Sequence, residues 1–168
     1  MAKRISLVLL VSLFAWTLFA GFKGDQEEYA EKGHKAPQFQ LASIQGESMK
    51  LTDYDGKLIV LNFWATWCGP CKTEMPALNQ FSQQSGDITV IGINMTDNES
   101  SKTAVMQFVK EYEISFPILL DHSGSVFEKY RILSLPSTFF INEDGVIVEY
   151  HIGPLTERYL RETARKLQ

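Results

Sequence analysis

Residues 67–72 read Trp67-Cys68-Gly69-Pro70-Cys71-Lys72 and contain the only two cysteines of this 168-residue chain. They follow an apolar run, residues 58–64, that is typical of a buried strand, and they precede a stretch with helical periodicity. Thiol–disulfide exchange requires a dithiol at such a strand-to-helix junction, because the helix start stabilises a thiolate. We therefore expect Cys68 to attack disulfides and Cys71, one turn further along, to resolve the mixed disulfide.

Two other uses of the cysteine pair are weaker. A structural disulfide across two intervening residues closes too small a loop to restrict the unfolded chain much. A zinc site would need two further ligands, and the three histidines are scattered along the sequence. We therefore expect redox chemistry with no metal and with no cofactor beyond the Cys68–Cys71 disulfide, tuned by Gly69 and Pro70.

Glu74 is a further candidate, because it lies one helical turn after Cys71. A carboxylate that pointed inward there would have a raised pKa and could relay protons during thiolate formation. A carboxylate in the first turns of a helix is more often solvated and stabilised by the helix dipole. The residues alone favour this solvated alternative.

Leu135-Pro136 comes directly before a predicted strand and is the second candidate element. A cis proline beside the dithiol would remove one backbone N–H from that surface and would turn a neighbouring carbonyl and amide toward a substrate. Trp67 is expected to form an apolar rim beside Cys68 that binds substrate, whereas Trp64 is expected to pack in the core. The predicted substrate-binding residues are therefore Trp67, Gly69, Pro70 and Leu135.

The first 24 residues differ from the rest of the chain. Lys3 and Arg4 precede Ile5–Phe22, 18 residues without a charge, which as a helix would span about 27 Å, close to the thickness of a bilayer's hydrocarbon core. We expect an uncleaved anchor over residues 1–24 that leaves the domain outside the cytoplasm; a cleaved signal peptide is the alternative. Residues 25–35 are expected to form a linker, and residues 36–168 the folded domain.

Residues 25–168 carry 13 basic and 20 acidic side chains, which argues against a nucleic-acid surface. Strands alternate with helices and then give way to a hairpin and a final helix, which predicts an α/β sandwich with a mixed sheet. The expected strands are a short pair around Gln45-Gly46 and residues 58–64, 88–94, 116–120, 138–142 and 146–150. The expected helices are residues 70–84, from 100 or 101 to 112, 123–130 and 156–167.

Residues 62–76 read Asn62-Phe63-Trp64-Ala65-Thr66-Trp67-Cys68-Gly69-Pro70-Cys71-Lys72-Thr73-Glu74-Met75-Pro76 and resemble the thioredoxin superfamily. The closer resemblance is to the ResA/TlpA-like branch, the membrane-anchored extracytoplasmic thiol–disulfide oxidoreductases of bacteria. Ala36-Pro37-Gln38-Phe39 at the domain start and Leu135-Pro136-Ser137-Thr138 support it. The resemblance implies a thioredoxin-like fold, with a central mixed β-sheet, helices on both faces, an N-terminal strand pair and an αβ insertion within about residues 95–120.

The resemblance also implies roles and partners that the residues alone do not show. Pro136 would be cis and would face the dithiol, and Glu74 would be the active-site glutamate, which reverses the preference for a solvated side chain. Substrates would be oxidised extracytoplasmic proteins, such as apocytochrome c or spore-envelope proteins. A membrane thiol–disulfide transporter of the CcdA type would supply electrons to a monomeric enzyme.

Two positions depart from the family pattern. Asn62 replaces the buried aspartate of thioredoxin, so that this position cannot transfer a proton and Glu74 is the better candidate. Some cytochrome-maturation members have an acidic residue between the cysteines where this chain has Gly69, which weakens the case for a cytochrome client.

Three rival functions remain to be compared with a protein-disulfide reductase. A peroxidase of the peroxiredoxin type needs a threonine and an upstream proline where this chain has Ala65 and Val60. A Sco-type copper metallochaperone needs one more residue between its cysteines, although His151 could supply the histidine that it requires. A disulfide oxidant or isomerase would share every motif and would differ only in potential and partner surface.

Overall fold

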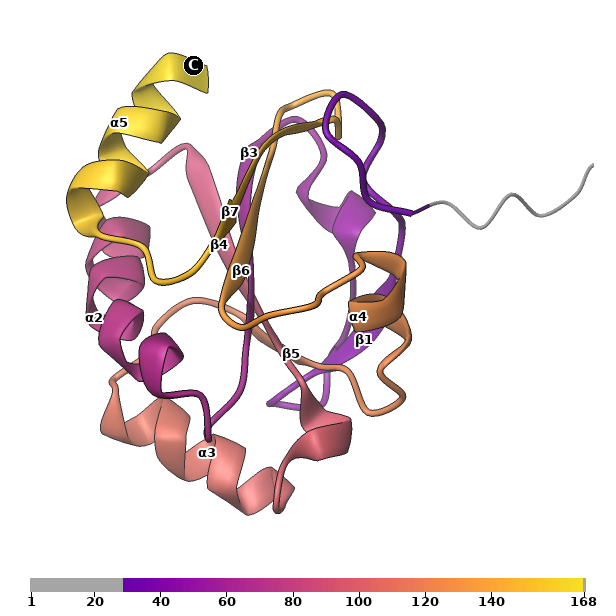
Figure 1. The fold of residues 1–168 in the computed structure, drawn as a ribbon, viewed down its shortest axis with the longest axis vertical. Helices are drawn as coiled ribbons and strands as arrows, with labels where there is room; N and C mark the ends of the chain where they lie inside the picture. Colours follow the sequence, from indigo (N-terminus) through magenta and orange to yellow (C-terminus); the bar gives the residue numbers. More distant parts are fainter. Residues whose placement is uncertain (1–28, 168) are drawn as a thin grey trace, which may run out of the picture.

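The computed structural model describes residues 29–167. One seven-stranded sheet has the strand order β2-β1-β5-β4-β3-β6-β7 (Figure 1). Its strands are β1 (Gln40–Ser43), β2 (Ser48–Lys50), β3 (Leu58–Trp64), β4 (Ile88–Asn94), β5 (Ile118–Leu120), β6 (Ser137–Ile141) and β7 (Ile147–Ile152). The helices are α2 (Gly69–Gln84), α3 (Lys102–Glu111), α4 (Ser125–Lys129) and α5 (Glu157–Leu167), with 3-10 turns η1 (Leu51–Tyr54) and η2 (Thr96–Asn98).

The two central strands are the apolar runs of the sequence. All seven residues of β3 are buried, because β3 pairs in parallel with β4 and antiparallel with β6 and is covered on both faces. Both strands have the bounds that the sequence predicts. The carboxyl end of β3 leads directly to the cysteines, so a fully buried strand carries the candidate site.

Helices cover both faces of the sheet, and successive side chains of β3 point alternately to one face and to the other. Leu58, Val60 and Trp64 pack with side chains from α2, α3 and α5. Ile59, Leu61 and Phe63 pack on the opposite face with α4 and with the segment before β1. The expected α/β fold with helices on both faces is confirmed.

The N-terminal strand pair and the central insertion meet at one side of the sheet. β1 pairs antiparallel with β2 across the predicted turn and antiparallel with β5, whereas β5 pairs in parallel with β4. The predicted insertion contains η2, α3 and β5. β5 begins at Ile118 rather than at residue 116, since Pro117 has no N–H to donate to a neighbouring strand.

Residues 29–35 lie against the domain, although the sequence places them in the linker. Ala30 donates its N–H to the Lys129 carbonyl (3.0 Å), and Gly33 donates to the Ile147 carbonyl (2.8 Å). Residues 30 and 33 therefore hydrogen-bond to the folded domain. The expected anchor, residues 1–24, lies outside the described residues. Within residues 29–167, none of the helices combines the length and the apolar character that crossing a bilayer requires.

Candidate active site

The cysteine pair lies where β3 ends and α2 begins. Cys68 is the N-cap of α2, and its sulfur accepts a hydrogen bond from the Cys71 N–H (3.1 Å). The two sulfurs form a disulfide, with 5.3 Å between the Cα atoms. Cys71 is fully buried, whereas Cys68 keeps 5% of its surface exposed and lines a surface pocket. The end of the helix thus points one backbone donor at the sulfur that outside molecules reach.

Glu74 points inward and is fully buried, so the solvated alternative is wrong. Its Oε1 accepts a hydrogen bond from Asn62 Nδ2 (2.8 Å), and its Oε2 accepts one from the Leu155 N–H (2.8 Å). Burial raises the pKa of Glu74 to about 7, although both hydrogen bonds oppose the shift. The carboxyl group can therefore gain or lose a proton near neutral pH.

Asn62 and Thr138 complete this buried polar cluster. They face each other across β3 and β6, and Asn62 Nδ2 also donates to Thr138 Oγ1 (3.0 Å). Asn62 Oδ1 is buried and has no hydrogen-bond partner within the described part of the chain. Burial, not these contacts, raises the pKa of Glu74, because the Asn62 amide and the Leu155 N–H both donate to its carboxylate and stabilise the charged form.

The Leu135–Pro136 peptide bond is cis, as the resemblance implies. Pro136 is buried directly before β6, and its carbonyl accepts a hydrogen bond from the Gly153 N–H (2.8 Å). Leu135 lines the same pocket as Cys68. The structure thus brings residue 135 beside the cysteine from a position more than sixty residues later in the sequence.

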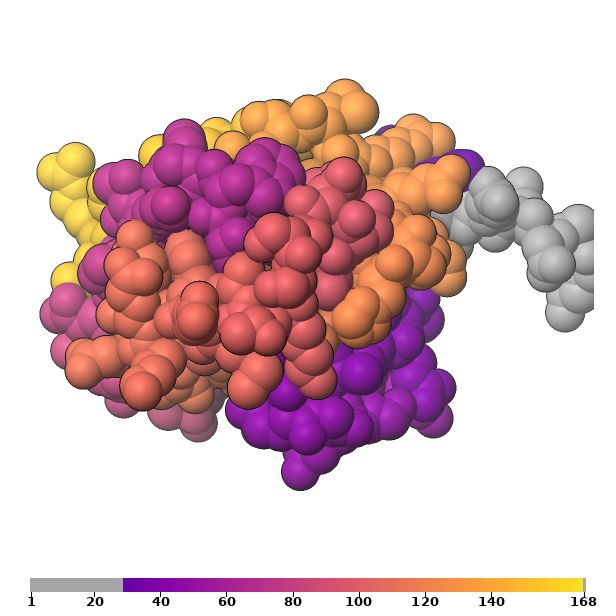
Figure 2. Space-filling model, turned by 90° about the horizontal axis from the view of Figure 1, so that it is seen from below, coloured from indigo at the N-terminus to yellow at the C-terminus, as the bar shows by residue number. Residues whose placement is uncertain are grey.

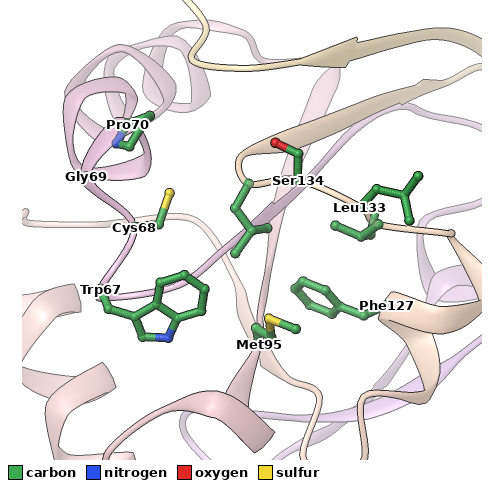
Figure 3. A pocket seen from close by; sticks show the side chains of 10 residues that line it. Trp67, Cys68, Gly69, Pro70, Met95, Phe127, Leu133 and Ser134 are labelled. Atoms are coloured by element: carbon green, nitrogen blue, oxygen red, sulfur yellow. The ribbon is translucent and has the colours of Figure 1, made fainter.

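An apolar pocket of about 470 Å³ opens beside Cys68 (Figure 3). None of the side chains that line it is charged. It contains all four predicted substrate-binding residues and Cys68, and in addition Met95, Phe127, Ile132, Leu133 and Ser134. No sequence pattern indicates these five residues, because they come from the end of β4, from α4 and from the loop after it.

The two tryptophans near the cysteines have different environments. Trp67 is 56% exposed and donates its Nε1–H to the Asn98 carbonyl (3.1 Å), so the indole is held at the rim of the pocket. Trp64 is fully buried, and its ring lies 4.8 Å from that of Phe108, as expected for core packing. His151, on β7, lies against the ring of Tyr159 at a centroid distance of 4.7 Å.

Comparison with known proteins gives consistent results. The AhpC/TSA family matches residues 32–150. The chain is 36% identical to the thioredoxin-like protein YneN of Bacillus subtilis, over 94% of this chain and 92% of that protein. It is 35% identical to the thiol-disulfide oxidoreductase ResA of the same organism, over 93% and 86% of the two chains. The crystal structure of StoA from Bacillus subtilis superimposes with a TM-score of 0.69 at 32% identity, covering 77% of this chain and 97% of that one.

Proposed function

The chain belongs to the AhpC/TSA family as a thioredoxin-like thiol–disulfide oxidoreductase, and on this premise we propose that it reduces disulfides of extracytoplasmic proteins through Cys68 and Cys71. The observation that carries the proposal is the position of Cys68. Its sulfur caps the start of α2, and it lies in the wall of an apolar pocket. A thiolate is stabilised there and a protein substrate can reach it.

The proposed reaction has two exchange steps. The Cys68 thiolate attacks a client disulfide, so that a Cys68–client bond forms and one client sulfur leaves as a thiolate. Cys71 then loses its proton and attacks Cys68, which releases the second client sulfur and leaves the Cys68–Cys71 disulfide. Two electrons pass from the dithiol to the client. Glu74, a proton acceptor one helical turn from Cys71, accepts the proton that Cys71 loses.

The reducing direction is supported by the electrostatics of the buried side. An ionised Glu74 disfavours a second negative charge nearby, and therefore disfavours the thiolate of the reduced state. Destabilising the reduced state lowers the reduction potential and makes the dithiol a better reductant. An oxidant or isomerase would have the same geometry but a higher potential.

The proposed location and partners follow from the N-terminal sequence. A charge-free run of 18 residues after Lys3 and Arg4 supports a single-pass anchor with the catalytic domain on the extracytoplasmic side. A membrane thiol–disulfide transporter of the CcdA type would return electrons to the dithiol of the monomeric enzyme. Clients would be oxidised proteins on that side; apocytochrome c and spore-envelope proteins are candidates, and the neutral Gly69 favours a set wider than cytochromes.

Reduction of insulin disulfides tests the activity. We expect turnover by the wild-type protein, no turnover by Cys68→Ser, and accumulation of mixed disulfides by Cys71→Ser, because only the attacking sulfur remains in that variant. Turnover by Cys68→Ser would exclude the mechanism. Equilibration with a glutathione buffer tests the direction: we expect a potential near that of thioredoxin, about −270 mV, whereas a value near that of DsbA, about −120 mV, would identify an oxidant.

A further inference from the structure

A single carboxylate of the inserted segment holds the turn that precedes Cys68. Glu99 follows η2, and its Oε1 accepts hydrogen bonds from the Thr66 N–H (2.7 Å) and from Asn94 Nδ2 (2.8 Å). Its Oε2 accepts a short hydrogen bond from the Thr66 hydroxyl. Three donors therefore converge on one side chain, and two of them belong to Thr66, two positions before the cysteine.

The inserted segment also holds Trp67, the residue that follows Thr66 in the turn. The Asn98 carbonyl accepts the indole N–H of Trp67 (3.1 Å). The turn itself is closed by one backbone hydrogen bond, from the Cys68 N–H to the Ala65 carbonyl (3.3 Å). Figure 2 shows the inserted segment on the same face of the molecule as the start of α2. The side-chain hydrogen bonds of Thr66 and Trp67 thus go to residues 98 and 99.

We propose that Glu99 is a positioning residue of the redox site, which fixes the turn at residues 65–68 so that the Cys68 sulfur stays over the start of α2. The inference assumes that the dithiol is the reactive centre, as proposed above. The thiolate is stabilised only while it faces the donors of the helix start, and this stabilisation falls steeply with distance. A turn released from Glu99 would let Cys68 move away from the Cys71 N–H, because only the hydrogen bond from Trp67 to the Asn98 carbonyl would still tie the turn to residues 98 and 99.

The carboxylate also has an opposing effect, and the two effects predict different results for two variants. A negative charge near Cys68 disfavours its thiolate. Glu99→Gln removes this charge but can keep the contacts: its oxygen can accept from Thr66 N–H and Asn94, and its amide can donate to the Thr66 hydroxyl. Glu99→Ala removes both the charge and the contacts. If positioning has the larger effect, Glu99→Ala raises the pKa of Cys68, whereas Glu99→Gln leaves it unchanged or slightly lower.

The pH dependence of iodoacetamide alkylation of the reduced protein measures the pKa of Cys68. We expect Glu99→Ala to raise this pKa by at least about 0.5. It should also lower the rate of insulin reduction roughly tenfold, because a displaced nucleophile attacks less often in the right geometry. Glu99→Gln should leave the pKa unchanged or slightly lower. Glu111→Ala removes an exposed carboxylate from the same insertion and should behave like the wild type.

A Glu99→Ala protein with the alkylation profile of the wild type would overturn the inference. So would equal shifts in Glu99→Ala and Glu99→Gln, because charge alone would then explain them. If Glu99→Ala does not fold, Thr66→Val removes one of the three hydrogen bonds and should raise the pKa by a smaller amount; no rise would again contradict the inference. Insulin reduction by the wild type but not by Cys68→Ser would show that the proposed function stands in either case.

Discussion

The two sides of the Cys68–Cys71 disulfide differ in polarity and in access to solvent. On the inner side, Glu74, Asn62 and Thr138 are fully buried and joined by hydrogen bonds. On the outer side, the pocket is apolar and its rim is open, since Trp67 is 56% exposed and Leu133 is 93% exposed. Within an otherwise apolar core, the buried polar cluster and the exposed apolar rim form a local reversal of the usual pattern of a soluble protein, which is apolar inside and polar outside.

The reversal separates two tasks that thiol–disulfide exchange requires. Burial raises the pKa of Glu74 to about 7, so the inner side supplies a carboxyl group that titrates near neutral pH. A protein client needs an accessible sulfur and an apolar surface to lie on, so the attacking cysteine has to be on the outer side. The start of α2 holds one cysteine toward each side.

The largest expected effect tests the inner side through the pH dependence of stability. The folded pKa of Glu74, about 7, lies above its ordinary value of 4.5, so the folded state binds this proton more tightly. Stability from this group is therefore complete below about pH 4.5 and is lost as the pH rises through 7. In the oxidised protein, the free energy of unfolding of the wild type relative to Glu74→Gln should fall by about 3 kcal/mol across that range.

Urea unfolding of both proteins at pH 4.5, 6 and 8 measures this difference. The disulfide stays intact throughout, so no thiol contributes to the titration. Glu111→Gln, at an exposed position of α3, is the matched control and should show a constant difference from the wild type. A difference between the wild type and Glu74→Gln that did not change with pH would mean that Glu74 keeps an ordinary pKa, and the inner side would lose its proposed role.

A smaller effect is expected on the outer side. Leu133→Ser should change the free energy of unfolding by less than about 0.5 kcal/mol, because the side chain is already 93% exposed. It should raise KM for a protein disulfide about fivefold, since a client would no longer bury this leucine, and should leave reduction of a small disulfide unchanged.

Met106→Ser provides the control for this effect. Met106 is 51% exposed on α3 and does not line the pocket beside Cys68. The KM of Met106→Ser for the same protein disulfide should equal that of the wild type. Equal KM values for Leu133→Ser and the wild type would show that clients do not use the outer wall of the pocket.

Local sequence patterns were sufficient to predict the strands and the helix around the cysteines. The bounds of β3 and β4 follow from two continuous apolar runs, and α2 begins one residue earlier than predicted. The helix starts expected near residues 101 and 156 have capping side chains: Ser101 accepts from the Ala104 N–H, and Thr156 accepts from the Tyr159 N–H. These features depend on neighbours within a few residues, which the sequence displays directly.

The environment of the site depends on distant residues and was less predictable. The hydrogen-bond partners of Glu74 lie 12 and 81 positions away, so its burial could be expected only from the family resemblance. Glu99 was not recognised, because nothing in its neighbourhood indicates that it reaches Thr66, 33 positions earlier. The outer wall of the pocket, with Phe127 and Leu133, was missed for the same reason.

The most direct test of the difference between the two sides is the alkylation of each cysteine in the reduced wild-type protein at neutral pH, followed by mass spectrometry. Iodoacetamide reacts with accessible thiolates, and Cys68 lines the pocket whereas Cys71 is fully buried. We predict that Cys68 is modified at least about tenfold faster than Cys71. Equal rates, faster modification of Cys71, or no modification of either cysteine would contradict the account.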